Sequence, residues 1–136
     1  MAAPANELQA AVYAALLGSD GVTGAVATRV YDRVPDAGDT VPFITIGDGT
    51  ERPDLDQCKD ISDTTITVNV WSEKQGGFKE CKEIAFHAKR AVLRDIAELP
   101  THALIGIDLL ETRYLRDPDG ITSRAILTFE AMIEEN

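Results

Sequence analysis

The stretch GDGTER, residues 47–52, is the first place in this sequence where chemistry could occur. Its G-x-G pattern is found in loops that let the backbone approach the pyrophosphate of a dinucleotide. Such a loop needs a third glycine at the start of a helix, but Arg52 stands at that position and a polar stretch with a proline follows. The pattern therefore predicts no nucleotide site, and we expect no cofactor.

Four acidic residues crowd the same part of the chain: Asp48, Glu51, Asp54 and Asp56. Carboxylates in a loop can bind Ca²⁺, but a calcium loop alternates its oxygen ligands and closes with a bidentate glutamate. The spacing here is irregular. We therefore expect a solvated acidic loop and no metal site.

Histidine and cysteine residues are sparse. His87 falls inside a predicted helix, His102 follows a proline, and neither has a second ligand at the spacing that zinc requires. Both histidines are expected at the surface or at a helix end. Cys81 falls on an apolar helix stripe, which favours a core residue over a nucleophile. Because Cys81 and Cys58 form no C-x-x-C pair, both are expected as free thiols.

Catalytic patterns are missing from the rest of the sequence. No serine lies in a G-x-S-x-G context, and the paired acids Asp117 and Asp119 belong to a turn sequence. We therefore predict that the protein is not an enzyme, although a triad assembled from residues distant in sequence stays open as an alternative.

Composition and charge limit the possible partners. The chain has 136 residues and a net charge of −10, and residues 36–63 contain eight acidic and two basic residues. No basic patch stands out, which argues against tight binding to a phosphate backbone. No apolar run approaches the ~20 residues that cross a bilayer, and the N-terminus lacks signal-peptide features. We expect a single domain spanning 1–136 that is made in a reducing cytoplasm and has no membrane contact.

Periodicity predicts the elements of the first half. Residues 6–17 have one apolar helical face, with Asn6 as a possible N-cap and Gly18 as a stop. Residues 18–34 are ambiguous, with a possible short helical turn followed by an extended piece around Val30 to Val34. A strand begins at Phe43, and residues 47–62 form either a long loop or an extended hairpin arm.

The second half gives clearer signals. Residues 64–72 alternate as a strand, with Trp71 on the face opposite the apolar residues. A long helix is expected over about 78–97, followed by strands over about 106–116 and 121–134. The turn DPDG between these strands favours a hairpin, and a change of phase after Leu109 indicates a bulge.

This order of elements predicts an α+β fold. We expect a four-stranded, mostly antiparallel sheet with two main helices packed on one face.

Several stretches together resemble a known family: LQAAVYAALL, RVYDRVPDAGDTVPFITIGD, TTITVNVWSEKQGGFKECKEIA and LRDPDGITSRAILTFEAMIE. The most specific pieces are Val30–Pro35, the strand end Val70–Ser72 before a glycine pair, and the hairpin tip Arg116–Gly120. They are similar to the tail-completion, or tail-terminator, proteins of tailed bacteriophages and gene transfer agents. The likeness covers nearly the whole chain, and its motifs belong to the scaffold rather than to catalysis.

This resemblance implies a structural role in a particle. Such proteins assemble as a ring, typically a hexamer, that caps the finished tail tube and offers a surface to the head-side connector. The implied partners are copies of the same chain, the tail tube protein and the head–tail connector protein. DNA would pass through the ring without specific binding. The implied location is the tail of a virion or phage-like particle assembled in the bacterial cytoplasm.

Candidate interface residues follow from charge and residue type. An acidic arm could meet a basic helix surface of a neighbouring copy, because closing a ring by head-to-tail contacts needs two different patches on each subunit. Trp71 is the best single anchor, since tryptophan is favoured at binding hot spots; alternatively it covers the strand end against the helix. The candidate residues are Asp48, Glu51, Asp54, Asp56, Trp71, Lys82, Lys89, Arg116 and Asp119.

Two other functions remain open at this point. The chain could be a head–tail connector or tail tube subunit of the same kind of particle. It could also be a cytosolic ligand-binding or regulatory α+β domain.

Overall fold

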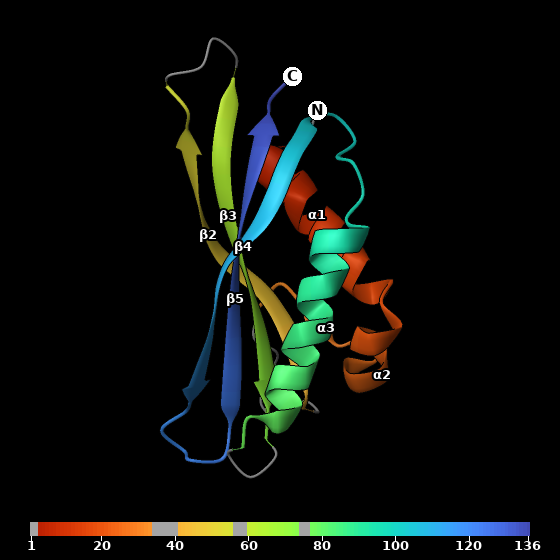
Figure 1. Ribbon diagram of the computed structural model, residues 1–136, viewed down its shortest axis with the longest axis vertical. Helices are drawn as coiled ribbons and strands as arrows, with labels where there is room; N and C mark the ends of the chain where they lie inside the picture. Colours follow the sequence, from red (N-terminus) through yellow and green to blue (C-terminus); the bar gives the residue numbers. More distant parts are fainter. Residues whose placement is uncertain (1–2, 34–40, 56–59, 74–76) are drawn as a thin grey trace.

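The computed structural model describes residues 3–33, 41–55, 60–73 and 77–136. Three helices lie on one face of a five-stranded sheet, and the opposite face has no covering layer in the described part of the chain (Figure 1). In chain order the elements are α1 Pro4–Leu17, α2 Asp20–Val26, β1 Val30–Tyr31, β2 Phe43–Pro53, β3 Ile61–Ser72, α3 Lys79–Asp95, β4 Ala103–Arg116 and β5 Ser123–Glu134.

The strand order is β1-β2-β3-β5-β4, and every pairing is antiparallel except that of β1 with β2. The sheet is therefore mixed and has five strands, where the sequence predicted four. The additional strand, β1, falls in the extended piece expected around Val30, and it pairs only Val30 with Ile44 and Tyr31 with Thr45. Two residues are too few to show the alternation that identifies a strand. The short helix α2 confirms the helical turn suspected after Gly18. Ser19 caps this helix, because its side chain accepts the Val22 N–H.

The hydrophobic core lies between the helices and the inner face of the sheet. Alternate residues of β3 and β5 point inward, as predicted, because successive side chains of a strand face opposite sides. In α3 the buried residues recur at helical spacing and include Cys81, confirming its place in the core. The fully buried side chains of largest volume are Phe129, Leu8, Leu16, Ile44, Ile46, Leu127, Ile133, Val12, Val22, Val26, Val68 and Val70.

The helix boundaries correct two expectations. Helix α1 begins at Pro4 with Ala3 as its N-cap, so the prediction that Asn6 caps it is wrong. Proline is well suited to the first helical position because its missing N–H would have no partner there. Helix α3 ends at Asp95, with Ile96 already extended, so the helix stops before Pro100 is reached.

Residues 47–62 are mainly an extended hairpin arm rather than a long loop. β2 runs on to Pro53, and its pairing with β3 continues from Phe43↔Trp71 to Pro53↔Ser62. Residues 56–59, at the tip, lie outside the described residues. Most of residues 47–62 therefore belongs to paired strands. The polar, glycine-containing sequence of this stretch had hidden the strand pattern.

The β4–β5 hairpin contains the predicted bulge and the predicted turn. The register of β4 against β5 shifts between Leu109 and Glu111, and a second shift lies between Leu104 and Gly106. Gly120 has a φ of 73°, the left-handed conformation that glycine adopts without strain. Both findings confirm the sequence prediction for this hairpin.

Candidate functional site

The acidic candidates lie along the exposed arm. Glu51 projects from β2 and is exposed, as is Asp48 at a bulge in the strand, while Asp54 is half-buried beyond the end of β2. Asp56 lies outside the described residues. The described residues contain no group of three or more histidines, cysteines or acids able to hold a metal ion. The described part of the arm thus presents an acidic surface, and the absence of a metal site stays a prediction.

A glycine bulge sets the shape of this arm. The register of β2 against β3 shifts between Gly47 and Gly49, and a Cβ at Gly49 would lie only 2.0 Å from the Thr65 carbonyl oxygen. The Thr67 hydroxyl donates to the Asp48 carbonyl at 2.8 Å, and the Thr50 N–H donates to the Thr65 hydroxyl at 2.8 Å. Glycines inside a strand mark a bulge or a close backbone approach, so the G-x-G pattern was a signal for this geometry.

The basic candidates lie on the outer surface of α3 and β4, each beside an aromatic ring. Lys82 Nζ lies 5.1 Å from the centre of the Tyr114 ring, and Arg116 Cζ lies 5.0 Å from that of Phe78. Farther along α3, Lys89 Nζ lies 5.4 Å from the centre of the Phe86 ring. We call this the basic–aromatic surface; it comprises Phe78, Lys82, Phe86, Lys89, Arg90, Tyr114 and Arg116.

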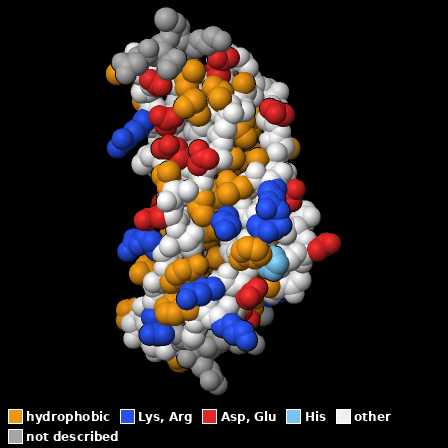
Figure 2. Space-filling view, viewed as in Figure 1, with side chains coloured by type: hydrophobic (Ala, Val, Ile, Leu, Met, Phe, Trp, Pro, Cys, Tyr) orange, Lys and Arg blue, Asp and Glu red, His pale blue; other side chains and the backbone are white. Residues whose placement is uncertain are grey.

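The acidic arm and the basic–aromatic surface lie toward opposite ends of the sheet. The arm end of β3 pairs Ile61 with Glu134, whereas the other end pairs Ser72 with Ser123, which in turn pairs with Arg116. In Figure 2 the acidic side chains gather toward the upper end, and the basic side chains lie mainly over the middle and lower parts of this face. The structure thus separates the two charged patches along one axis.

Trp71 lies on the sheet face opposite the helices, so the reading in which it packs against the helix is wrong. Its ring stacks on Phe43, with centroids 6.0 Å apart, and Arg124 Cζ lies 4.8 Å from its centre on the same face. Its indole N–H donates to the Thr45 hydroxyl at 3.1 Å. Trp71 therefore covers one end of the outer sheet face and is half-buried there.

The Asp119 side chain forms hydrogen bonds within its own turn. Its carboxylate accepts the Ile121 and Thr122 N–H groups, both at 2.9 Å, and the Thr122 hydroxyl at 2.8 Å. These bonds favour the ionised form and lower the pKa of Asp119. The side chain stabilises the shape of the hairpin tip, and a contact role for it remains a prediction.

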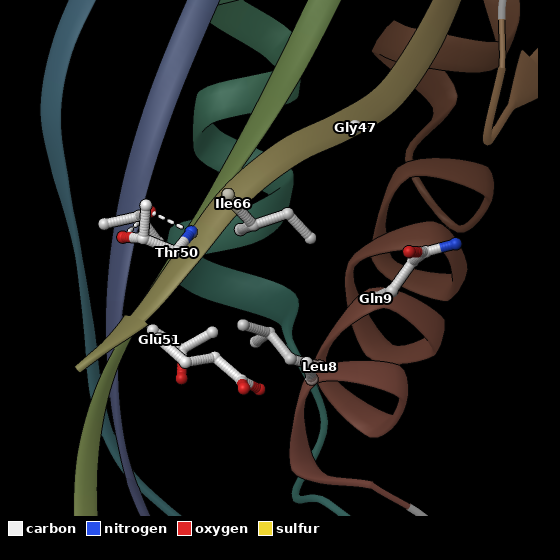
Figure 3. Close-up of a pocket in the computed structure, with 10 residues that line it drawn as sticks. Leu8, Gln9, Gly47, Thr50, Glu51 and Ile66 are labelled. Atoms are coloured by element: carbon white, nitrogen blue, oxygen red, sulfur yellow. Dashed lines mark hydrogen bonds between the residues drawn. The ribbon is translucent and has the colours of Figure 1, made fainter. Parts of the chain in front are cut away.

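Sequence reasoning missed a groove between α1 and β2. The groove has a volume of about 350 Å³ and opens beside the bulge (Figure 3). Its walls come from helix α1 on one side and from β2 and β3 on the other: Ala5, Leu8, Gln9, Gly47, Gly49, Thr50, Glu51, Thr64, Thr65 and Ile66. The residues lie far apart in the chain, so no local pattern predicts their meeting.

A buried polar cluster near the start of α1 was also missed. Glu7 is 6% exposed and accepts hydrogen bonds from the Thr101 N–H and hydroxyl groups, which lower the pKa of its carboxyl. His102 is 6% exposed, and its Nδ1 accepts the Asn136 N–H at 3.2 Å. His102 is therefore buried, contrary to the expectation of a surface position. Its neighbour Thr101 bonds to Glu7 of α1, and Asn136 bonds to both Thr101 and His102.

Cys81, the cysteine that the structure describes, is not an activated nucleophile. Burial raises the pKa of the Cys81 thiol to about 11, which keeps it protonated near neutral pH. Its Sγ lies 3.7 Å from the Val70 carbonyl oxygen, to which the thiol donates. Cys58 lies outside the described residues. No helix of the described part is long and apolar enough to cross a membrane.

Comparison with known proteins shows the family of this chain and a solved structure that resembles it. No curated protein sequence matches the chain closely enough to count as a relative. Among solved structures, a chain of the "Virion of native gene transfer agent (GTA) particle" is similar over 98% of this chain and 99% of its own length. The two are 27% identical, with a TM-score of 0.86. The family model for tail completion protein gp17 matches residues 10–134, and the chain belongs to that family.

Proposed function

We propose that this protein, a structural component of a phage-like tail, forms a ring that terminates the tail tube and joins it to the head-side connector. The ring acts by binding and not by catalysis. The observation that carries this proposal is the likeness over almost the full length to a chain of a gene transfer agent virion.

The placement of charge supports a closed ring. A head-to-tail contact joins two different patches, and it forms a ring when the rotation between subunits closes. Two patches lie toward opposite ends of one subunit: the acidic arm, with Asp48 and Asp54, and the basic–aromatic surface, with Lys82 and Lys89. In our proposal the arm of one copy contacts the basic–aromatic surface of the next.

Aromatic rings should strengthen this contact. Phe86 is 45% exposed and Tyr114 is 39% exposed, yet each has a cation beside it. Aromatic and arginine side chains are enriched among residues that dominate binding energy. An acidic arm placed over this surface would pair with the cations and cover the rings.

Native mass spectrometry and electron microscopy of the purified protein test the ring. We expect one closed ring, a hexamer by family resemblance, and we expect it to stop growth when added to polymerising tail tube protein. Stacking into filaments would instead indicate a tube subunit. A protein that stays monomeric at high concentration and leaves tubes uncapped would overturn the proposal.

Charge reversal tests the subunit contact. The double variant Lys82→Glu, Lys89→Glu should shift the mass distribution from the ring toward the monomer. Arg94→Glu is the matched control, because Arg94 is exposed on the same helix outside the basic–aromatic surface. An unchanged ring mass in the double variant would count against the contact.

A further inference from the structure

In the part of the chain that the structure describes, one edge of the sheet has no paired strand next to the groove between α1 and β2. Among the described residues, β1 pairs only with Ile44 and Thr45, so residues 47–53 of β2 pair with β3 alone. The Thr50 and Asp54 N–H groups both point toward β3, where they donate to Thr65 and Ile61. Backbone groups alternate sides along a strand. The N–H and C=O of Glu51 therefore point away from β3, toward the open edge.

The groove limits what can occupy this edge. Helix α1 forms its far wall through Ala5, Leu8 and Gln9, while β2 forms the near wall (Figure 3). A second sheet cannot approach the edge here, because its other strands would meet α1. A single extended segment brings no further strands with it, and its addition to a strand edge is a recurrent mode of peptide recognition.

The lining indicates the chemistry of the occupant. Glu51 is the only ionisable residue among the ten that line the groove, and Figure 3 shows its side chain directed toward Leu8. Thr64, 3% exposed, also lines it, and its hydroxyl is buried without a hydrogen-bond partner in the described part of the chain. Buried polar groups normally have a partner. A polar group of the occupant, or a water trapped beneath it, would supply the one that Thr64 lacks.

We propose that this groove binds a single extended segment of another protein, which adds as a strand to β2 and places a lysine or arginine beside Glu51. Resting on the proposed function, the segment belongs to a partner protein of the same particle. Backbone hydrogen bonds to Glu51 supply affinity, and the side chains of Glu51 and Thr64 supply selectivity. At Gly47 an added Cβ would meet nothing within 4 Å, so this position leaves open space beside β2.

Amide NMR of the purified protein with the capped peptide TVKVKVT tests this site. We expect chemical-shift changes concentrated at Ala5–Gln9, Gly49–Glu51 and Thr64–Ile66. The matched peptide TVEVEVT should bind more weakly, and TVKVKVT with alternate backbone amides N-methylated should not bind. Shift changes located instead on α3 and β4, or equal binding of the N-methylated peptide, would overturn the proposal.

Three variants sharpen the test. Ala5→Phe fills the groove and should abolish peptide binding, whereas Ala14→Phe, at an exposed position of the same helix, should leave it unchanged. Glu51→Gln should raise the Kd of TVKVKVT about two- to fivefold, the usual size of an exposed ion-pair effect. Equal peptide binding by the Ala5→Phe and Ala14→Phe variants would exclude the groove as the site.

Cross-linking within assembled particles tests the source of the segment. A photo-cross-linking residue in place of Gln9 should trap an extended, basic segment of a different protein. A cross-link to a second copy of this chain, or none, would overturn that assignment. These results are independent of the ring test, since ring formation is read from native mass and groove binding from peptide shifts.

Discussion

The two halves of β2 differ in almost every respect although they form one continuous strand. Phe43–Ile46 lies beside β1 within the helix-covered part of the sheet, and its four residues are buried. Gly47–Pro53 continues into the arm, and all seven residues are exposed. The bulge between Gly47 and Gly49 marks the boundary. The inward residues Ile44 and Ile46 join the core beneath the helices, whereas Phe43 and Thr45 are covered by Trp71 on the outer face. The comparison shows that covering helices and side chains, rather than strand pairing, decide which part of the strand is buried and which part stays available for contacts.

Different forces hold the two halves. The covered half gains from burial of apolar surface, which contributes roughly 25 cal/mol per Å². The arm depends on backbone pairing and on threonine hydroxyls that bind across the bulge. Substitutions in the two parts should therefore differ in size and in kind.

The largest effect should come from the covered half. Phe129→Ala removes a fully buried ring of β5 and should lower the free energy of unfolding by about 3–5 kcal/mol, because it leaves a cavity. Met132→Ala, on the outer face of the same strand and 39% exposed, is the control and should cost less than about 1 kcal/mol. Urea unfolding followed by circular dichroism measures both. Equal losses would mean that the core does not lie where the structure places it.

The bulge offers an intermediate effect. Gly49→Ala should destabilise the protein by about 1–3 kcal/mol, since the added Cβ would collide with the Thr65 carbonyl oxygen. Gly47→Ala, two residues away, meets nothing within 4 Å and should change stability by less than about 0.5 kcal/mol. The same unfolding measurement separates them. If Gly47→Ala were the more damaging variant, the register of the bulge would be wrong.

The hairpin tip should show a smaller effect that depends on pH. The lowered pKa of Asp119 means that its carboxylate stabilises the folded state above the ordinary aspartate pKa of 3.8. This contribution is lost as pH falls below that value and through the lower folded-state pKa. Asp119→Ala should therefore lower Tm at pH 7 and shrink the difference from wild type at pH 2–3. A difference that is constant across this range would contradict the ionic role of Asp119.

The last prediction concerns the thiol reactivity of Cys81, and here we expect no reaction in the native protein. In a Cys58→Ser background, Cys81 should stay unreactive toward a thiol reagent such as DTNB at pH 8, because it is fully buried and its pKa is raised to about 11. Adding denaturant should expose it and give one equivalent of reaction. Rapid labelling of the native protein would show that the covered half opens readily.

Much of the fold could be predicted where residues alternate regularly. The inward residues of β3 and β5, the stripe of α3 and the left-handed Gly120 were all readable, because each depends on neighbours close in sequence. The pairing of the extended residues Val30 and Tyr31 with β2 and the end of α3 at Asp95 were not, since tertiary packing overrides local preference at such points. The arm was recognised only as one of two possibilities, because its polar residues carry no hydrophobic period.

The candidate contact surfaces were likewise predicted only in part from the sequence. Charge alone indicated an acidic segment around Glu51 and a basic helix around Lys82, and it gave no means of placing them relative to each other. The structure puts them toward opposite ends of the sheet and adds aromatic rings beside the cations. It also confirms the sheet face predicted for Trp71 and the turn position of Asp119, and it adds their partners, Phe43 for Trp71 and the Ile121 and Thr122 N–H groups for Asp119.

By itself the sequence determined the element types, the inward faces of the long strands and the resemblance that led to the family, because these depend on residue identity and short-range periodicity. Only the tertiary structure decided the groove beside α1, the burial of His102 and the free edge at Glu51. Each of these features forms where segments distant in the chain pack together. The free energy that stabilises such packing depends on the whole tertiary structure, so no single stretch of residues predicts it.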